Sequence, residues 1–425
     1  MKAAFFTLGC KVNQYDSTAM AEILQNAGYE IVSFDEYADV YIVNTCTVTN
    51  VADKKSRNMI RRAKSRNKDA VLCACGCLPQ KDSREVLRMD GVDAVIGTGE
   101  RSRLLEILGR CQNKKQVDAV RPLEKTEPFE VLSVSTSGEK TRAHLKIQEG
   151  CNQFCSYCII PHVRGRSRSR HIESILSEAQ ALAQNGFLEL VLTGINISAF
   201  GKDTGESLAS LILALDKLPG IRRIRLGSLE PPVFTPEFIR RLQQSQKVCP
   251  HFHLSLQSGS DTVLQRMNRK YTTKEYAGVV QALRQAFDRP AITTDIIAGF
   301  PGETEDEFQQ TFAFTRQIGF SRIHVFPYSE RAGTPAAQMD GSVPKAVRKK
   351  RAQLLIELGN TLEEEYAGQF LGTLQQVLFE DRNKEQLFEG YTDRYLRVAA
   401  EVAGPGLANV LLKEQKYGIM IGSVV

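Results

Sequence analysis

Three cysteines lie close together near the middle of the chain, in the segment CNQFCSYCII at residues 151–160. Cys151, Cys155 and Cys158 follow the pattern C-x3-C-x2-C, with no fourth cysteine nearby. Thiolates at this spacing can hold three irons of a cubane iron–sulfur cluster and leave the fourth iron without a protein ligand. That iron can bind a substrate or cofactor, which a fourth cysteine would prevent.

Two alternatives fit the same residues. His162 can serve as a fourth ligand, which would make the set a structural zinc site. The cysteines can also be small hydrophobic side chains that meet by chance. The segment directly follows a predicted strand, and a (β/α) barrel carries its chemistry on the loops at its strand ends. We therefore favour the open iron–sulfur cluster.

A second set of cysteines is spread over the first eighty residues. Cys10, Cys46 and Cys77 each come just after an apolar run that predicts a strand. The ends of parallel strands meet at one edge of a sheet, where ligand sites form, so the three predict a second metal centre. Cys73 and Cys75 compete with Cys77 for the third position, but they alternate within the run AVLCAC, as buried side chains of a strand do. The alternative for the whole set is unconnected core cysteines.

The composition is that of an ordinary globular protein. The chain has 425 residues, of which 42% are hydrophobic and 24% charged, and this length favours two or three domains. No apolar run is long enough to cross a membrane and the start MKAAFFTLGC lacks the features of a cleaved signal, so we expect a cytoplasmic protein. In a reducing compartment, ten cysteines are more often metal ligands than disulfides. Cys111 and Cys249 have no companions and are expected to be ordinary buried thiols.

The first 120 residues alternate between short apolar runs and helical patterns such as Ser17–Ala27. This alternation predicts an N-terminal α/β domain with a parallel sheet covered on both faces. The expected strands are Lys2–Leu8, Val40–Asn44, Ala70–Ala74 and Val92–Gly97. A polar linker around one short strand is expected at residues 121–142.

Residues 143–366 contain six further strand–helix units and a trailing helix, Lys345–Tyr366. Six units predict a partial (β/α)6 barrel, two short of the full eight. Its strands are expected at His144–Gln148, Glu189–Thr193, Arg222–Leu226, Phe252–Leu256, Ile292–Ile297 and Arg322–Phe326. Residues 367–425 have short β-rich runs (Leu374–Phe379, Tyr395–Ala399 and Val410–Leu412) that predict a small β-barrel.

Six words of the sequence resemble those of the radical S-adenosylmethionine (radical SAM) methylthiotransferases. The resemblance covers essentially the whole chain and implies a radical SAM barrel with a TRAM-like tail. The words are TLGCKVNQYDS (residues 7–17), VNTCTVT (43–49), CNQFCSYCIIPHVRGRSRSR (151–170), TGINIS (193–198), SLQSGSD (255–261) and TDIIAGFPGET (294–304).

The resemblance implies a transferase with S-adenosylmethionine and two [4Fe–4S] clusters as cofactors. The cluster on the cysteines at 151, 155 and 158 would take part in reductive cleavage of the cofactor to a 5′-deoxyadenosyl radical. The cluster on those at 10, 46 and 77 would carry the sulfur to be inserted. The electron would come from a donor such as flavodoxin or ferredoxin.

The family has branches that differ in substrate. The tetrad Lys11–Gln14 (KVNQ) resembles the branch that methylthiolates carbon 2 of N6-threonylcarbamoyladenosine beside the tRNA anticodon. Other branches act on isopentenyladenosine in tRNA or on an aspartate of a ribosomal protein. From another functional class, a zinc-stabilised RNA-binding protein without catalysis is the alternative.

Residues at the strand ends of the central barrel are the expected cofactor contacts. A glycine at such an end lets the backbone approach a ligand closely. The candidates are Thr193, Gly194, Glu230, Ser255, Gln257, Asp295 and Phe326, with Gly299 and Tyr328 as further strand-end positions.

Basic residues are concentrated where RNA would have to pass. The net charge is +6, and the word HVRGRSRSRH predicts a ladder of arginines at the mouth of the active site, where tRNA phosphates would bind. Its members are Arg164, Arg166, Arg168 and Arg170. The tail from Gly368 to Val425 has six Lys or Arg and seven Asp or Glu, so only local arginines, Arg394 and Arg397, are proposed as RNA contacts there.

Overall fold

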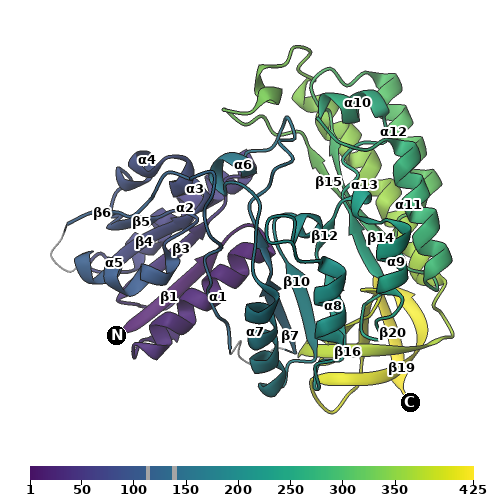
Figure 1. Cartoon of the computed structure of the whole chain (residues 1–425), viewed down its shortest axis with the longest axis horizontal. Helices are drawn as coiled ribbons and strands as arrows, with labels where there is room; N and C mark the ends of the chain where they lie inside the picture. The colour runs from purple at the N-terminus through teal and green to yellow at the C-terminus, as the bar shows by residue number, and fades with distance from the viewer. Residues whose placement is uncertain (112–114, 136–140) are drawn as a thin grey trace.

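A computed structural model describes residues 1–111, 115–135 and 141–425 of the chain. Its N-terminal part contains a six-stranded sheet in which every neighbouring pair is parallel, in the order β2-β1-β3-β4-β5-β6 (Figure 1). The strands are β1 (Lys2–Thr7), β2 (Glu30–Val32), β3 (Val40–Thr45), β4 (Val71–Gly76), β5 (Ala94–Ile96) and β6 (Val117–Asp118).

Both faces of this sheet are buried. Along β3, Val40 and Ile42 belong to one apolar cluster, and Tyr41 and Val43 belong to another on the opposite face. Near-continuous apolar strands of this kind are typical of parallel sheets covered by helices on both sides. The helices are α1 (Lys11–Asn26), α2 (Asn50–Arg66), α3 (Cys77–Lys81), α4 (Ser83–Leu87) and α5 (Leu104–Cys111).

Helix α1 begins at Lys11, before the apolar pattern that predicted a helix from Ser17. Its first turns bury polar side chains, which the pattern of apolar residues does not reveal. The amide of Asn13 donates to the carbonyls of Leu8 and Thr45 at 2.6 and 3.0 Å, and this ties the start of the helix to two strand ends.

The predicted partial barrel is confirmed as two parallel sheets of central strands, in the orders β11-β10-β7 and β12-β13-β14-β15. Only Gly227 separates β11 from β12, and a side chain there would lie 2.7 Å from the Leu192 carbonyl. The strands are β7 (Arg142–Lys146), β10 (Glu189–Thr193), β11 (Arg223–Leu226), β12 (Ser228–Leu229), β13 (His251–Leu254), β14 (Ala291–Ala298) and β15 (Arg322–Pro327).

Helices cover the outside of this arc (Figure 1). A short antiparallel pair, β8 (Gln148–Glu149) and β9 (Arg168–Ser169), frames the cysteine loop. The helices are α6 (Ile160–Val163), α7 (Ile172–Gln184), α8 (Leu208–Asp216), α9 (Pro236–Leu242), α10 (Asp261–Arg266), α11 (Thr273–Ala286), α12 (Glu305–Ile318) and α13 (Lys345–Gly368).

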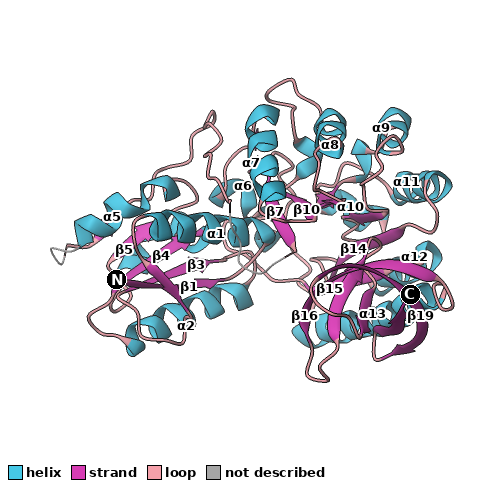
Figure 2. Cartoon of the chain, turned by 90° about the horizontal axis from the view of Figure 1, so that it is seen from below, coloured by secondary structure: helices cyan, strands magenta, loops and turns pink. Residues whose placement is uncertain are grey.

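The C-terminal part is a closed five-stranded barrel, β16-β17-β18-β20-β19, as predicted. It packs against the end of α13 and the start of β11 (Figure 2), where the guanidinium of Arg223 donates to the carbonyls of Tyr391 and Gln376. The strands are β16 (Leu374–Arg382), β17 (Phe388–Thr392), β18 (Arg397–Ala400), β19 (Gly406–Lys416) and β20 (Ile419–Val424).

The segment expected to be a linker packs against the two large parts. Residues 121–135 contain no strand, and residues 136–140 of the expected linker lie outside the described residues. The hydroxyl of Tyr15 donates to the carbonyl of Leu132 at 2.5 Å, and the Leu132 and Val134 side chains are buried. None of the helices in the described parts of the chain is both long and apolar enough to span a membrane.

Candidate functional site

Cys151, Cys155 and Cys158, here called the central triad, lie in the loop between β8 and α6. The loop turns at Gly150, whose φ is +69° and where a side chain would lie 2.0 Å from the Arg166 carbonyl. Burial raises the pKa of the Cys158 thiol to about 12, with smaller contributions from its two partner thiols. Burial also raises the pKa of Cys151, and Cys155 acts in the same direction. The three sulfur atoms therefore lie close to one another.

Two residues that the sequence did not single out donate hydrogen bonds to this triad. Arg269, in the loop after α10, donates from Nη1 to the Sγ of Cys155 at 3.1 Å. The Asn196 side chain, just past the end of β10, bonds to the Cys151 thiol. Donors of this kind stabilise a thiolate sulfur, and the cationic Arg269 does so more strongly than a neutral group.

Cys10, Cys46 and Cys77, here called the N-terminal triad, follow the ends of β1, β3 and β4. A side chain at Gly9 would lie 3.1 Å from the Sγ of Cys46, so the loops that hold Cys10 and Cys46 are in contact. Burial raises the pKa of Cys46 to about 12, and Cys77 and Cys10 add to the shift. Burial and Cys10 likewise raise the pKa of Cys77. The structure thus brings these cysteines together at one edge of the sheet.

The loops of the N-terminal triad are fixed by local hydrogen bonds. The hydroxyl of Ser56 accepts from the amide of Cys46 at 3.1 Å and donates to the carbonyl of the same residue at 3.0 Å. Gly76 has a φ of +93°, and a side chain there would lie 2.6 Å from the Asn44 side-chain oxygen. Glycine at this position therefore lets the chain turn directly into α3 at Cys77.

Cys73 and Cys75 lie within β4, whereas Cys77 follows its end. Both belong to the apolar cluster that packs against α1 and α5, whereas Cys77 contacts Ile159 and Val163 near the central triad. Burial raises the pKa of the Cys75 thiol to about 12. Cys77 stays the predicted third ligand of the N-terminal triad.

Each triad supplies three thiols, which is the donor set that a [4Fe–4S] cluster with one open iron takes. Over residues 1–111, 115–135 and 141–425, no three His, Cys, Asp or Glu side chains are placed to hold one metal ion. In a cubane cluster each thiolate binds a different iron, so the sulfur atoms surround the cluster without meeting at one point. A set of three thiols with cationic and amide donors at the sulfur atoms is suited to such an anionic cluster.

Arg164 links the two triads. Its Nε donates to the Sγ of Cys77 at 3.4 Å, and its Nη1 donates to both carboxylate oxygens of Glu149 at 2.8 and 2.9 Å. Its Nη2 donates to the side-chain oxygen of Asn13. Lys146 also bonds Glu149 at 2.7 Å, and it bonds Asp16 at 2.8 Å. A buried network of charges therefore joins the N-terminal sheet to the cysteine loop of the barrel.

The expected arginine ladder is corrected by this network. Arg164 is 0% exposed and Arg170, paired with Glu178, is 2% exposed. Arg168 is buried as well and donates to the Arg164 carbonyl at 2.8 Å. These three side chains cannot reach RNA phosphates because they are buried. Arg164 and Arg170 pair with acidic side chains, and Arg168 donates to a backbone carbonyl. Only Arg166 is exposed, with its guanidinium 4.4 Å from the ring centre of Phe154.

A cavity of about 800 Å³ opens between the three parts of the chain. Cys10 from the N-terminal part lines it, together with Thr193, Gly194 and Asp295 from the barrel. The C-terminal barrel contributes both predicted arginines and three tyrosines. These residues are Arg394, Arg397, Tyr391, Tyr395 and Tyr417.

Other predicted cofactor contacts lie at the central triad and outside this cavity. Glu230 bonds Arg269 at 3.2 Å and accepts from Gln153 at 2.5 Å, and the Ser255 carbonyl accepts from Arg269 at 3.5 Å. Glu230 and Ser255 therefore support the residues that hold Cys155.

Four further strand-end positions, which stay predicted cofactor contacts, lie outside the wall of this cavity. Gln257 is buried, and its backbone bonds those of Asp295 and Ile297 at 2.9 Å. A side chain at Gly299 would lie 2.5 Å from Arg348, and Tyr328 packs on Phe300. Phe326 is 46% exposed on the strand β15 and is absent from the cavity wall.

The three tyrosines of the cavity differ in accessibility. The rings of Tyr391 and Tyr395 stack with centres 4.5 Å apart, and Tyr417 is 94% exposed. Arg397 is 46% exposed on its side chain and pairs with Glu389, while Arg394 is mostly buried against Asp393 and the Asp288 carbonyl. Arg142 lies 5.0 Å from the ring centre of Tyr391, and Arg225 lies 4.7 Å from that of Tyr395, so these two rings are already covered. The exposed ring of Tyr417 is the aromatic surface on which a base of a single nucleic-acid strand can stack.

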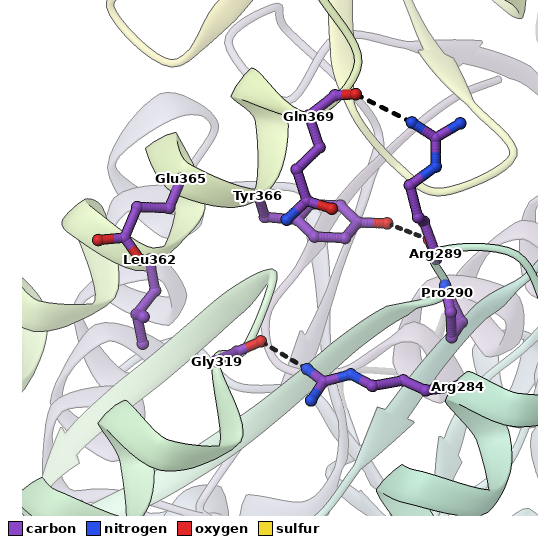
Figure 3. Close-up of a pocket in the computed structure, with 8 residues that line it drawn as sticks. All are labelled: Arg284, Arg289, Pro290, Gly319, Leu362, Glu365, Tyr366 and Gln369. Atoms are coloured by element: carbon purple, nitrogen blue, oxygen red, sulfur yellow. Dashed lines mark hydrogen bonds between the residues drawn. The ribbon is translucent and has the colours of Figure 1, made fainter.

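A smaller cavity of about 320 Å³ lies between α11, the last turns of α13 and the residues just before β14 (Figure 3). Arg289 donates to the Gln369 carbonyl at 2.9 Å, Tyr366 to the Arg289 carbonyl at 2.8 Å and Arg284 to the Gly319 carbonyl at 2.9 Å. The polar groups drawn here thus join one backbone segment to another. None of the six cysteines lines this cavity.

Comparisons with known proteins agree with this arrangement. The chain matches the Uncharacterized protein family UPF0004 over residues 2–97 and the Radical SAM superfamily over residues 145–315. Among solved structures, the radical S-adenosylmethionine methyltransferase TsrM from Kitasatospora setae has a TM-score of 0.61 at 15% identity, covering 79% of this chain and 73% of TsrM. The cobalamin-dependent S-adenosylmethionine radical enzyme OxsB has a TM-score of 0.51 at 12% identity, covering 86% of this chain and 56% of OxsB. At these identities the likeness concerns the fold alone.

Curated relatives are closer in sequence. A Bacillus subtilis (strain 168) protein named threonylcarbamoyladenosine tRNA methylthiotransferase MtaB is 44% identical over 402 residues, covering 93% of this chain and 89% of the relative. A protein of the same name from Aquifex aeolicus (strain VF5) is 40% identical, with coverages of 92% and 96%. The tRNA-2-methylthio-N(6)-dimethylallyladenosine synthase of Pelotomaculum thermopropionicum is 38% identical, with coverages of 89% and 86%. The chain therefore belongs to the radical SAM methylthiotransferase family.

Proposed function

We propose that this chain is a tRNA methylthiotransferase that inserts a methylthio group at carbon 2 of N6-threonylcarbamoyladenosine next to the anticodon. The observation that carries the proposal is the shared cavity, because Cys10 of one triad and Thr193 and Gly194, which precede the Asn196 partner of the other, line the same space. The relatives named MtaB, at 44% and 40% identity, support the choice of nucleoside.

The two triads are proposed to hold two [4Fe–4S] clusters, and S-adenosylmethionine is proposed to bind at the central one. When bound, these groups supply the radical and the sulfur that the reaction requires. The hydrogen on carbon 2 of adenine is not acidic, so no acid–base group of the chain could remove it at neutral pH. Asn196, Arg269 and Arg164 donate to the sulfur atoms and thereby stabilise negative charge in a buried region.

The rest of the cavity serves the RNA in this proposal. A modified adenine in the single-stranded anticodon loop can be splayed out of its stack. Tyr417 would stack on a base, while Arg166 and Arg397 are accessible arginines for phosphates. A tRNA substrate implies a cytoplasmic enzyme, and the reductive step requires an electron donor such as flavodoxin or ferredoxin.

The proposal is tested with anaerobically reconstituted protein and two alanine variants. Wild-type protein should be brown with about eight irons per chain, from two four-iron clusters. Cys155→Ala should abolish both cleavage of S-adenosylmethionine and RNA modification. Cys46→Ala should lose about four irons and methylthio insertion while cofactor cleavage continues. Methylthiolated product from the Cys46→Ala variant would show that the N-terminal triad does not carry the sulfur, and a colourless zinc protein would exclude the whole proposal.

Dimethylallyladenosine is the second candidate nucleoside, because one relative with a name of that kind is 38% identical over most of its length. Mass spectrometry of tRNA nucleosides from a deletion strain separates the two. Loss of the methylthio group from threonylcarbamoyladenosine alone supports the first proposal, and loss from dimethylallyladenosine alone supports the second.

A further inference from the structure

The charged side chains on the wall of the large cavity are mostly neutralised by partners. Arg225 bonds Glu189 through Nε and Nη2 at 2.7 and 3.1 Å. Arg322 lies 3.9 Å from Glu363. Together with the pairs of Arg394 and Arg397 described above, these contacts pair the arginines of the cavity wall with acidic side chains.

Lys11 is the exception. It is the first residue of α1, directly after Cys10, and its side chain is exposed to the cavity. In the described portion of the chain, no carboxylate lies within 4 Å of its ammonium group and no acceptor within hydrogen-bond distance. This part of the wall therefore presents an unpaired ammonium group beside a cysteine of the N-terminal triad.

Such a position suits an anionic group of the substrate, and the substrate proposed above carries one. The threonyl part of N6-threonylcarbamoyladenosine ends in a free carboxylate, whereas the dimethylallyl group is uncharged and apolar. On adenine, N6 and carbon 2 lie on the same edge, on either side of N1. A base that presents carbon 2 to Cys10 therefore presents its N6 substituent to the neighbouring wall, where Lys11 lies.

We propose that Lys11 binds the carboxylate of the threonylcarbamoyl group and so selects this nucleoside over those with an uncharged N6 substituent. The inference rests on the proposed function and goes beyond it, because it assigns the choice of nucleoside to one side chain. An ammonium–carboxylate hydrogen bond adds affinity for the charged substrate. A substrate without the carboxylate leaves the cation unpaired in the closed site, which lowers its affinity.

The test compares three anticodon stem–loop RNAs, which carry threonylcarbamoyladenosine, the same nucleoside with its carboxylate converted to a carboxamide, and dimethylallyladenosine. The reconstituted holoenzyme is used as wild type, as Lys11→Met, as Lys11→Arg and as the control Lys274→Met. Lys274 is an exposed lysine on the outer helix α11. For each combination of protein and RNA we measure kcat/KM for methylthiolation. We also measure the Kd of the RNA by fluorescence anisotropy.

Lys11→Met should lower kcat/KM for the threonylcarbamoyl RNA about 10- to 100-fold, the effect of losing a hydrogen bond to a charged group. Its kcat/KM for the carboxamide RNA should be no lower than that of the wild type, because the variant leaves no cation unpaired beside this substrate. Lys11→Arg should retain most of the preference for the carboxylate, and Lys274→Met should behave as the wild type. The Kd of each RNA should rise where kcat/KM falls and stay unchanged where kcat/KM stays unchanged.

Two other sources of an anion give different results. An equal loss on all three RNAs would mean that Lys11 binds a backbone phosphate, and a rise confined to the KM for S-adenosylmethionine would mean that it binds the carboxylate of the cofactor. Either result overturns the assignment, as does a preference that survives in Lys11→Met. Failure of the wild-type enzyme on the threonylcarbamoyl RNA, by contrast, would refute the proposed function itself.

Discussion

The Nε of Arg164 donates to the Sγ of Cys77 at 3.4 Å, although the two residues belong to different parts of the chain. The same guanidinium is bidentate to Glu149, two residues before the first cysteine of the central triad. One buried side chain thus contacts the loops of both cysteine triads. The relative position of the two triads depends on a network of charges in the interior, and such networks are sensitive to the loss of one member.

Replacement of Arg164 by Met should therefore destabilise the protein by about 3 kcal/mol or more, since it leaves the buried Glu149 with Lys146 as its remaining cation. Denaturant unfolding of the purified variant measures the effect. Arg166→Met is the matched control from the same segment, and its exposed side chain should change the free energy of unfolding by less than about 0.5 kcal/mol. Equal effects of the two substitutions would contradict the role given to the buried network.

The choice among three neighbouring cysteines gives a second prediction. Cys77→Ala should reduce the iron content after reconstitution from about eight to about four per chain, because it removes a ligand of one four-iron cluster. Cys75→Ala should leave about eight irons, since Cys75 packs among apolar side chains of the sheet. Iron and sulfide analysis of the two reconstituted variants measures these contents. Loss of iron in Cys75→Ala with full retention in Cys77→Ala would exchange their roles.

The strand-end cysteines could be predicted from the sequence because the geometry of a parallel sheet brings strand ends together. Three strands that each end in a cysteine must present these residues at one edge, whatever the details of packing. The barrel and the small β-barrel were likewise predictable from the periods of their apolar residues. The start of α1 was not, because its first turns bury Asn13 and Asp16, whose partners come from distant segments.

The arginines near the central triad show why other parts of the site escaped prediction. The alternation in RGRSRSR resembles a solvent-exposed ladder, but Arg164 and Arg170 find Glu149 and Glu178 in the folded interior. Arg269 reaches Cys155 from 114 residues away. Contacts over such separations are set by tertiary packing, and no local pattern of residues indicates them.

The buried ion pair between Glu189 and Arg225, next to the C-terminal barrel, gives a prediction about pH. Hydrogen bonds and charge from Arg225 hold the pKa of Glu189 below its usual value of 4.5, against the opposing effect of burial. A carboxyl whose pKa is lowered on folding contributes stability that is present above its unfolded pKa and is lost as the pH falls below it. Wild type should therefore exceed Glu189→Gln in thermal midpoint at pH 6, and the difference should shrink as the pH falls below about 4.5.

This comparison is made on the iron-free chain, so that loss of iron in acid does not enter the measurement. Glu357→Gln, on the exposed side of α13, is the control and should show a small difference that does not depend on pH. A difference in thermal midpoint between wild type and Glu189→Gln that stays constant from pH 6 to pH 3 would show that the carboxylate form of Glu189 does not contribute to stability.

Arg269 provides a prediction about the redox properties of the central triad. Its Nη1 lies 3.1 Å from the Sγ of Cys155, and its Nη2 pairs with Glu230 at 3.2 Å. Hydrogen bonds and positive charge at a cysteine sulfur favour the reduced, more negative state of an iron–sulfur cluster and raise its reduction potential. Arg269→Met should lower the midpoint potential, whereas Arg269→Lys, which keeps the charge, should lower it less.

The potential is measured by titration monitored with electron paramagnetic resonance in a Cys46→Ala background, where the N-terminal cluster is absent. Arg316→Met, on the exposed face of α12, should leave the potential unchanged. A midpoint in Arg269→Met equal to that of the parent protein would mean that the contact with Cys155 positions the loop without affecting the electrons of the cluster.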